Sequence, residues 1–181
     1  MEDLCDLYAE PPTPGQPARF DYEYERKGTA NLFVAFCPEK AWRQVVVTAR
    51  RTAVDFAHFL RTLVEEHFPD AEVIRLVVDN LNTHTPASLY KAFAPEEARR
   101  LVSKLEWHYT PEHGSWLNQV EIEISILSRQ CLERRIPDAE TLRRQVKAWE
   151  AARNACRATI EWRFTSRDAR IKLKRLYPNH S

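Results

Sequence analysis

Two short apolar runs separated by helical sequence constrain the fold of this chain more than any other feature. Val73 to Val78 ("VIRLVV") and Leu105 to Tyr109 ("LEWHY") have the length and composition of strands, and turn-forming residues follow both. The first run has the pattern of a strand that is buried in a sheet. Because the sequence between the runs has helical spacing, strands alternate with helices along the chain, and this order predicts a sheet that helices cover.

Strand and helix patterns also precede these runs. Asn31 to Phe36 and Arg43 to Thr48 are rich in β-branched and aromatic residues, and a break around Pro38 separates them, so they predict an antiparallel hairpin. Apolar residues then recur at helical spacing from Thr52 to Phe68, and Pro69 ends that pattern.

The remaining segments are predicted to be helical. Residues 86–93 and 95–102 predict either one broken helix or two short helices. Ser115 is placed to cap a helix whose apolar stripe is Leu117, Val120, Ile124, Leu127 and Cys131. A last helix is predicted from Asp138 to Arg157. The whole pattern predicts an α/β fold with a mixed sheet flanked by helices.

Length and composition indicate one folded domain. With 181 residues, 44% of them hydrophobic, the chain can fill a single core. The proline-rich residues 1–20 predict an extended arm, which leaves residues 21–181 as the domain. No stretch approaches the roughly 20 apolar residues that span a bilayer, and the start is acidic, so a cytoplasmic protein without a membrane partner is expected. The four cysteines lack zinc-site spacings and are expected to be reduced and mostly core-facing.

The first candidate site lies where the strand predicted at Val73 to Val78 is expected to end. A carboxylate that directly follows a buried strand lies at the strand's mouth, where a metal ion can reach Asp79. The following "NLNTH" adds Asn80 and His84 as supporting polar groups. The alternative is that Asp79 is a capping residue and that the asparagines form a turn before the next helix.

The second candidate site is the segment "HYTPEHGSWLNQVEIEIS". It brings His113, Asn118, Glu121 and Glu123 to the start of a helix, whose free N–H groups are compatible with nearby carboxylates. Glu121 and Glu123 fall on opposite flanks of the apolar stripe, so periodicity does not choose between them. The alternative is that both are solvated glutamates beside a core-facing side of the helix.

The two motifs together resemble a known family. "VVDNLNTH" followed by "HYTPEHGSWLNQVEIEIS" is similar to the DDE-superfamily endonuclease domain of bacterial insertion-sequence transposases related to the mariner elements. The resemblance extends from about Asp21 ("DYEYERKGTANLF") to Arg175. It implies a ribonuclease-H-like fold and three carboxylates that bind two Mg²⁺ or Mn²⁺ ions. By motif, Asp79 is the second carboxylate and Glu121 is the third, three residues after Asn118, and Glu123 is a neighbour.

The resemblance also implies parts that this sequence does not show. Family members place a first catalytic aspartate at the end of an initial strand, after a helix-turn-helix region that binds DNA. Here the proline-rich arm runs directly into the later segment, so the first strand is expected to be missing and the chain to be a truncated copy. Asp21 is an alternative source of the missing acid. The expected function is therefore metal-dependent phosphodiester hydrolysis and strand transfer, or, alternatively, an inactive remnant that binds only DNA or a partner subunit.

The charge distribution supports double-stranded DNA as the partner, meaning transposon ends and target. Residues 129–181 carry 14 Lys and Arg against 6 Asp and Glu, and such residues neutralise phosphates. The alternative is that they only solvate helices. A homo-oligomer is a further expected partner. The expected DNA-binding residues are Arg143, Arg144, Lys147, Arg153, Arg157, Arg163, Arg167, Arg170, Lys172, Lys174 and Arg175.

Overall fold

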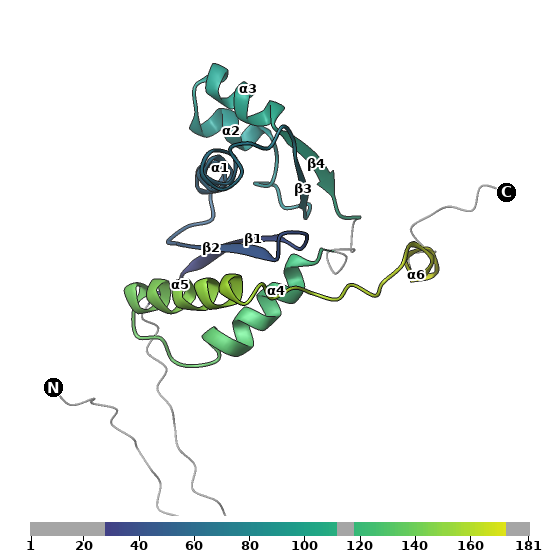
Figure 1. The fold of residues 1–181 in the computed structure, drawn as a ribbon. Helices are drawn as coiled ribbons and strands as arrows, with labels where there is room; N and C mark the ends of the chain where they lie inside the picture. Colours follow the sequence, from purple (N-terminus) through teal and green to yellow (C-terminus); the bar gives the residue numbers. More distant parts are fainter. Residues whose placement is uncertain (1–27, 112–117, 173–181) are drawn as a thin grey trace, which may run out of the picture.

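The computed structural model describes residues 28–111 and 118–172. The predicted order of strands and helices is confirmed there as far as residue 155, and one further helix that was not predicted follows (Figure 1). The elements are β1 (Asn31–Cys37), β2 (Trp42–Thr48), α1 (Ala53–Thr62), a π-helical turn (Leu63–His67), β3 (Ile74–Val78), α2 (Ala87–Ala92), α3 (Pro95–Ser103), β4 (Leu105–Tyr109), α4 (Val120–Leu127), a second π-helical turn (Ser128–Leu132), α5 (Ala139–Ala155) and α6 (Ser166–Lys172). The segment 86–102 therefore forms two short helices, which was one of the two alternatives.

The strands form two separate pairs, which corrects the expectation of one mixed sheet. β1 and β2 are antiparallel, with Asn31 opposite Thr48, whereas β3 and β4 are parallel, with Val78 opposite Tyr109. Within the described residues no strand joins the two pairs. The α/β class is confirmed, but α1 lies between the two pairs and packs against both of them (Figure 1).

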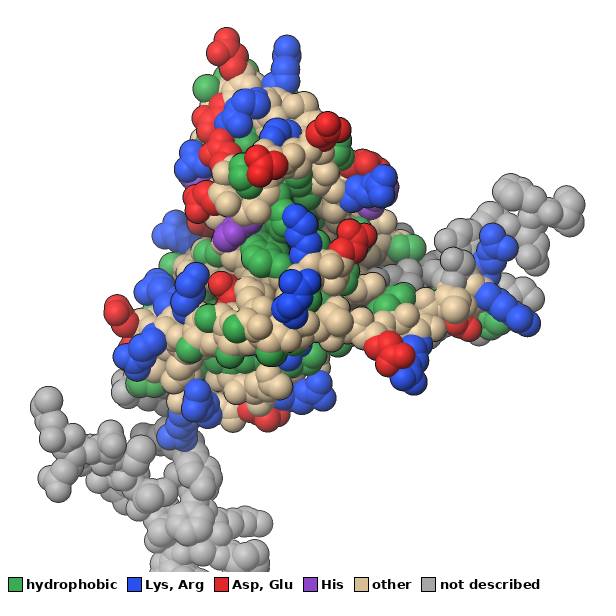
Figure 2. All heavy atoms as spheres, viewed as in Figure 1, with side chains coloured by type: hydrophobic (Ala, Val, Ile, Leu, Met, Phe, Trp, Pro, Cys, Tyr) green, Lys and Arg blue, Asp and Glu red, His purple; other side chains and the backbone are tan. Residues whose placement is uncertain are grey.

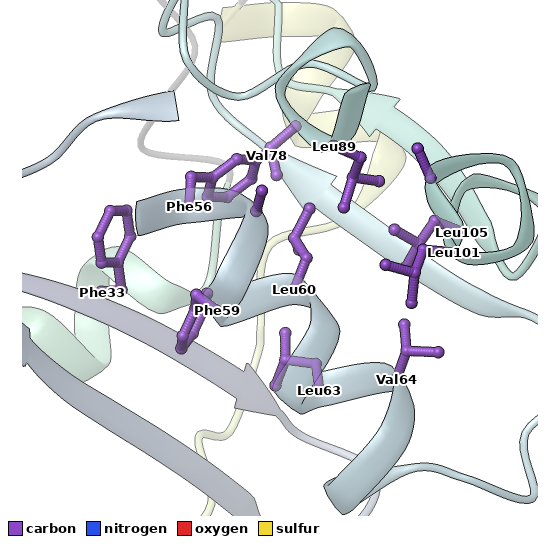
Figure 3. Packing of buried hydrophobic residues seen from close by; sticks show 12 residues of the cluster. Phe33, Phe56, Phe59, Leu60, Leu63, Val64, Val78, Leu89, Leu101 and Leu105 are labelled. Carbon is purple, nitrogen blue, oxygen red and sulfur yellow. The ribbon is translucent and has the colours of Figure 1, made fainter. Parts of the chain in front are cut away.

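The hairpin is covered on both faces because successive side chains of a strand point to opposite sides. Phe33 of β1 belongs to a core that it shares with α1, and its ring lies 5.5 Å from that of Phe59 (Figure 3). Val45 of β2 faces the other way and packs with Leu127 and Val146. This arrangement explains why residues 32–36 and 45–47 are continuously apolar: α1 covers one face, and α4 and α5 cover the other (Figure 1).

α1 starts at a capping box. The Thr52 hydroxyl accepts a hydrogen bond from the Asp55 N–H at 3.2 Å, and Asp55 accepts one from the Thr52 N–H at 2.8 Å. These bonds satisfy backbone donors that the first helical turn leaves unpaired. Leu60 of this helix is among the most buried side chains of the core, together with Leu89 of α2 and Leu101 of α3 (Figure 3).

The parallel pair is covered on one face only, which corrects the expectation that the strand before Asp79 is buried. Leu76 and Val78 face the core, but Arg75 and Val77 face away from it, and Val77 is 52% exposed. Arg75 forms an ion pair with Glu106 of β4 at 3.4 Å on the exposed face. This ion pair makes the exposed face partly polar, although Val77 remains exposed on it.

The face that α4 buries also differs from the predicted stripe. Leu127 and Cys131 are buried as expected, but Ile124 is 37% exposed, and Glu123 is fully buried in its place. The periodic pattern placed Ile124 inside because it weighs hydrophobicity alone, whereas Glu123 has a buried ionic partner on another element.

α5 begins one residue later than predicted. Asp138 is its N-cap and accepts a hydrogen bond from the Thr141 N–H at 2.7 Å. No helix within the described ranges is long and apolar enough to cross a membrane. The described cysteines are free thiols, but only Cys131 is buried, while Cys37 is half-buried and Cys156 is exposed, so the expectation that they mostly face the core is wrong.

Candidate functional site

Asp79 directly follows β3, at a strand end that hydrogen bonds hold in place. The Thr110 N–H donates to the Val78 carbonyl at 2.9 Å, which extends the pairing of β3 and β4 by one residue. The Asn80 amide then donates to the Thr110 carbonyl at 2.7 Å. Thr110 is buried, whereas Asn80 is exposed. Asn80 therefore supports the site by tying the two strand ends together.

The Asp79 carboxylate is oriented by its own loop. Its Oδ1 lies 2.5 Å from His84 Nδ1 and accepts a hydrogen bond from the Leu81 N–H at 3.2 Å. The His84 ring packs on Phe56 of the core, with 4.4 Å between ring centroids. His84 is thus held by the core and in turn holds Asp79.

The second Asp79 oxygen remains available. Within the described residues, Oδ2 has no hydrogen-bond partner, and the Asp79 side chain is 41% exposed. A carboxylate with one oxygen fixed and the other open is the arrangement that outer hydrogen-bond partners give to a metal ligand. The alternative that Asp79 has a capping or turn role is confirmed in part, because the hydrogen bond from the Leu81 N–H is a turn interaction. This bond uses only Oδ1 of Asp79.

Glu121 lies in the first turn of α4 and is exposed. Asn118 shapes this turn: its side-chain oxygen accepts from the Val120 N–H at 3.2 Å, and its carbonyl accepts from the Glu121 N–H at 3.1 Å. A carboxylate in the first turn of a helix is stabilised by the helix dipole. The convergence of Glu121 with Asp79 stays a prediction.

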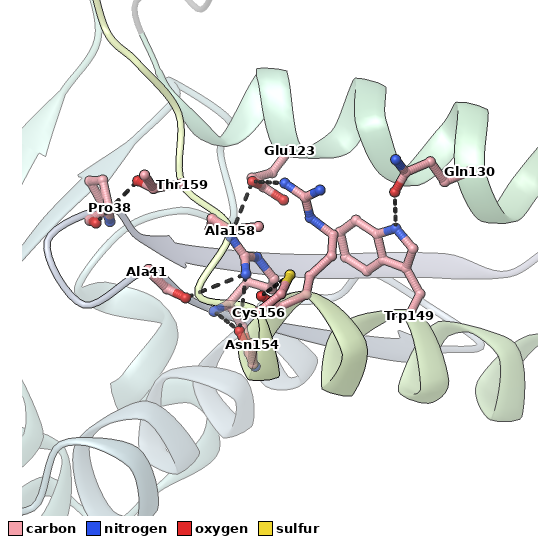
Figure 4. A network of polar contacts seen from close by, with 11 residues as sticks. Pro38, Ala41, Glu123, Gln130, Trp149, Asn154, Cys156, Ala158 and Thr159 are labelled. Carbon is pink, nitrogen blue, oxygen red and sulfur yellow. Dashed lines mark hydrogen bonds and ion pairs between the residues drawn. The ribbon is translucent and has the colours of Figure 1, made fainter.

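Glu123 has a different role from Glu121. It is fully buried, and its Oε1 lies 3.3 Å from Arg43 Nη2 of β2 and 2.9 Å from Arg153 Nη2 of α5 (Figure 4). Arg43 is itself fully buried and also donates to the Ala158 carbonyl. These bonds join β2, α4 and α5, so Glu123 is a structural residue rather than a solvated glutamate.

Sequence reasoning missed Arg43 entirely. The sequence pattern gives Arg43 only as the start of a strand. Both faces of this strand are covered, however, and a buried arginine requires a partner. The Arg43 N–H also donates to the Asn154 side-chain oxygen at 2.9 Å. The available signal was therefore a charge within the run "AWRQVVV".

The donor set fits a hard divalent cation in part. Carboxylate oxygens are the ligands that Mg²⁺ and Mn²⁺ prefer, and Asp79 and Glu121 supply them. Within the described residues, however, no group of three His, Cys, Asp or Glu side chains is placed to hold a metal ion. Asp21 and His113 lie outside the described residues.

Some of the predicted DNA-binding residues pair with an acidic side chain, and others are exposed. Arg153 is turned inward to Glu123 and is only 16% exposed, so we do not retain it as a DNA contact. Arg163 pairs with Glu161 at 2.7 Å. The exposed ones are Arg143, Arg144, Lys147, Arg157, Arg167 and Arg170. Lys172 is the last residue of α6, and Lys174 and Arg175 lie beyond the described part of the chain.

These cations share the surface with acidic side chains. Figure 2 shows Lys and Arg side chains, with some Asp and Glu among them, around the end of the molecule where α5 lies, and acidic and basic side chains are also mixed over α2 and α3. Arg143 and Arg144 form no ion pair with any described residue. They are therefore available to an external anion.

The comparisons agree with the chemistry of these motifs. The chain matches the family described as DDE superfamily endonuclease over residues 8–143, which include both Asp79 and Glu121. No curated protein and no solved structure gave a match. Since the matched segment covers most of the sequence, the chain belongs to the DDE superfamily of endonucleases.

Proposed function

We propose that this chain is the catalytic domain of a bacterial DNA transposase related to the mariner elements. It would hydrolyse phosphodiesters and transfer strands at transposon ends, with Mg²⁺ or Mn²⁺ bound by Asp79 and Glu121. Family membership supports an endonuclease. The observation that carries the proposal is the Asp79 carboxylate, with one oxygen held by His84 and the other open at a strand end.

The chain's own residues have distinct tasks in this proposal. Asp79 and Glu121 would hold Mg²⁺ or Mn²⁺, and the bound metal would supply Lewis-acid activation of the attacking oxygen and charge stabilisation at the leaving oxygen. His84 positions Asp79, and Asn80 fixes the strand end that carries it. Asn118 fixes the helical turn that carries Glu121. Each of these contacts limits the movement of a ligand, and outer hydrogen-bond partners commonly contribute 10–100-fold to metal affinity.

We assign residues 1–20 to an arm and residues 21–181 to a domain with the ribonuclease-H-like arrangement, acting in the cytoplasm and able to form a homo-oligomer. Double-stranded DNA is the proposed substrate, because the free arginines of α5 and α6 match its phosphates in charge.

Binding of Mn²⁺ tests the site separately from catalysis. Proton relaxation or electron paramagnetic resonance should detect Mn²⁺ binding to the chain, and Asp79→Asn should weaken it at least tenfold because the ligand charge is lost. His84→Ala should weaken it by roughly 10–100-fold while leaving Asp79 in place. Asp70→Asn, an exposed acid in another loop, is the matched control and should bind as the unmodified chain does.

The alternative function is a remnant that binds DNA or a partner subunit without cleaving. It is favoured by the lack of a three-ligand group within the described residues. If the chain binds DNA but Mn²⁺ affinity is the same in Asp79→Asn and in the control, the metal-site assignment is wrong and this alternative replaces it.

A further inference from the structure

The outer edge of β2 is covered by side chains of α5. The Arg43 N–H donates to Asn154 Oδ1 at 2.9 Å, and the Asn154 amide donates back to the Arg43 carbonyl at 2.8 Å. Two residues further along, the Val45 N–H donates to Glu150 Oε2 at 2.6 Å. Exposed strand edges pair readily with other chains, and these helix side chains occupy this one.

The hydrogen bonds from α5 side chains to the outer edge of β2 end before Val47. Since backbone groups alternate along a strand, the N–H of Val47 points to the same edge as those of Arg43 and Val45. The next α5 residues along this edge are Val146, Arg143 and Lys147. Valine has no polar side-chain atom, and arginine and lysine only donate hydrogen bonds. These three side chains therefore offer no acceptor to this part of the edge.

A hollow of about 520 Å³ lies at this place. Val45, Val46 and Val47 line it from β2, and Arg143, Arg144, Lys147 and Glu140 line it from α5. Its volume is within the range of small-ligand sites. Three cations against one acid line it, and Arg143 and Arg144 form no ion pair within the described residues. Hydrogen bonds from Thr141 and, more weakly, the charge of Arg144 lower the pKa of Asp138, so this acid partly balances Arg144. Lys147 lies 3.4 Å from Glu150 but is 78% exposed, so it can turn toward a ligand.

We infer that this hollow is a binding site for a phosphodiester of the DNA backbone. Donors converge on it from a strand edge and from two arginines, and phosphate oxygens are acceptors with the complementary charge. The apolar floor suits the sugar that flanks a phosphate. The inference rests on the proposed function, because it takes DNA as the ligand, and it assigns a specific contact to the basic surface.

An added peptide strand fits this edge less well. Strand addition uses N–H and C=O groups of several successive outward-facing residues. Here Asn154 and Glu150 already occupy the edge at Arg43 and Val45, which leaves little more than Val47. A single phosphate needs only one backbone donor and adjacent cations.

Charge reversal at the hollow provides the test. The double variant Arg143→Glu and Arg144→Glu should lower affinity for a short DNA duplex at least tenfold at about 100 mM salt. The slope of log affinity against log salt should fall by about one to two, because fewer counterions are released. The matched control is Lys91→Glu with Arg99→Glu, two exposed residues of α2 and α3 with the same total charge change.

The control residues lie at the opposite end of the molecule, with α1 and the hairpin between (Figure 1). Since the Debye length is about 10 Å at this salt concentration, the control should change affinity less than threefold. Equal losses in both variants would overturn the inference while leaving DNA as the substrate. No DNA binding by the unmodified chain would instead contradict the proposed function.

A second measurement needs no variant. In the unmodified chain, the amide resonance of Val47 should shift when the duplex is added, and that of Val77 on the exposed face of β3 should not. An unshifted Val47 resonance at saturation would overturn the inference. A loss of self-association in the charge-reversed variant, with DNA affinity unchanged, would assign the hollow to a second copy of the chain and would overturn it as well.

Discussion

At the scale of single residues, two glutamates two positions apart in α4 differ completely in environment. Glu123 is fully buried between Arg43 and Arg153, whereas Glu121 is exposed. Removing one partner of a buried ion pair is costly because the remaining charge stays desolvated. Glu123→Gln should therefore lower the free energy of unfolding by about 3–5 kcal/mol in urea denaturation.

Glu121→Gln is the control for that measurement. An exposed substitution without a buried partner usually changes stability by less than about 0.5 kcal/mol. In the proposed function, however, Glu121→Gln should weaken Mn²⁺ binding as Asp79→Asn does. Equal stabilities of the two variants would contradict the structural role of Glu123.

Cysteine reactivity is a second property at this scale. Burial raises the pKa of the Cys131 thiol, because desolvation disfavours the thiolate, and the thiolate is the reactive form. Iodoacetamide at pH 8 should therefore alkylate the exposed Cys156 well before Cys131. Peptide mass spectrometry over time measures this order, and alkylation of both sites at one rate in the folded chain would contradict it.

At the scale of elements, α1 depends on its capping box. Thr52→Ala removes the hydroxyl that accepts from the Asp55 N–H and should cost about 1 kcal/mol of unfolding free energy. Thr52→Ser keeps the hydroxyl and should cost much less. If both variants unfold at the same urea concentration, the box contributes nothing to stability.

The capping box also predicts a dependence on pH. Hydrogen bonds from Thr52 lower the pKa of Asp55 below its usual value. A carboxyl whose pKa is lowered on folding adds stability above its unfolded pKa, about 4, and loses that contribution as pH falls through the folded pKa. The stability difference between the unmodified chain and Thr52→Ala should thus be largest above pH 5 and shrink in acid. A difference that grows in acid would contradict this sign.

At the scale of the whole molecule, the third carboxylate decides whether the chain cleaves DNA. Asp79 and Glu121 give two anionic ligands, and no three-ligand group exists within the described residues. The proposed hydrolysis therefore needs a third carboxylate to fix the metal ions, and we expect only weak nicking of plasmid DNA by residues 1–181 in isolation with Mg²⁺ or Mn²⁺. Adding a strand that ends in Asp ahead of Asp21 should restore nicking.

Asp21→Asn completes this experiment and should leave activity unchanged. Strong metal-dependent nicking by the unmodified chain that Asp21→Asn abolishes would contradict the prediction and make Asp21 the third ligand. Gel assays of plasmid nicking with and without chelator separate these outcomes.

Local sequence determined most of the elements. The hairpin, α1 and α5 follow from patterns within one segment, and the caps at Thr52 and Asp138 lie next to the helices they start. Asp79 was placed at a strand end for the same reason, since the run before it and the turn after it are adjacent in the chain. These features depend on backbone preferences and hydrogen bonds a few residues apart.

Tertiary structure decided which polar groups are buried and how the strands associate. The partner of Glu123 is Arg43, 80 residues away, and no helical period reveals that pairing. Glu123 is therefore buried and Ile124 exposed, although the apolar stripe predicted Ile124 to be buried. Arg153 also forms an ion pair with Glu123, so it no longer counts among the expected DNA-binding residues. The division of the strands into two pairs was likewise not predictable, because pairing depends on how α1 packs between segments that are distant in sequence. A local pattern records what a residue prefers, whereas burial of a charge depends on a partner that only the folded chain supplies.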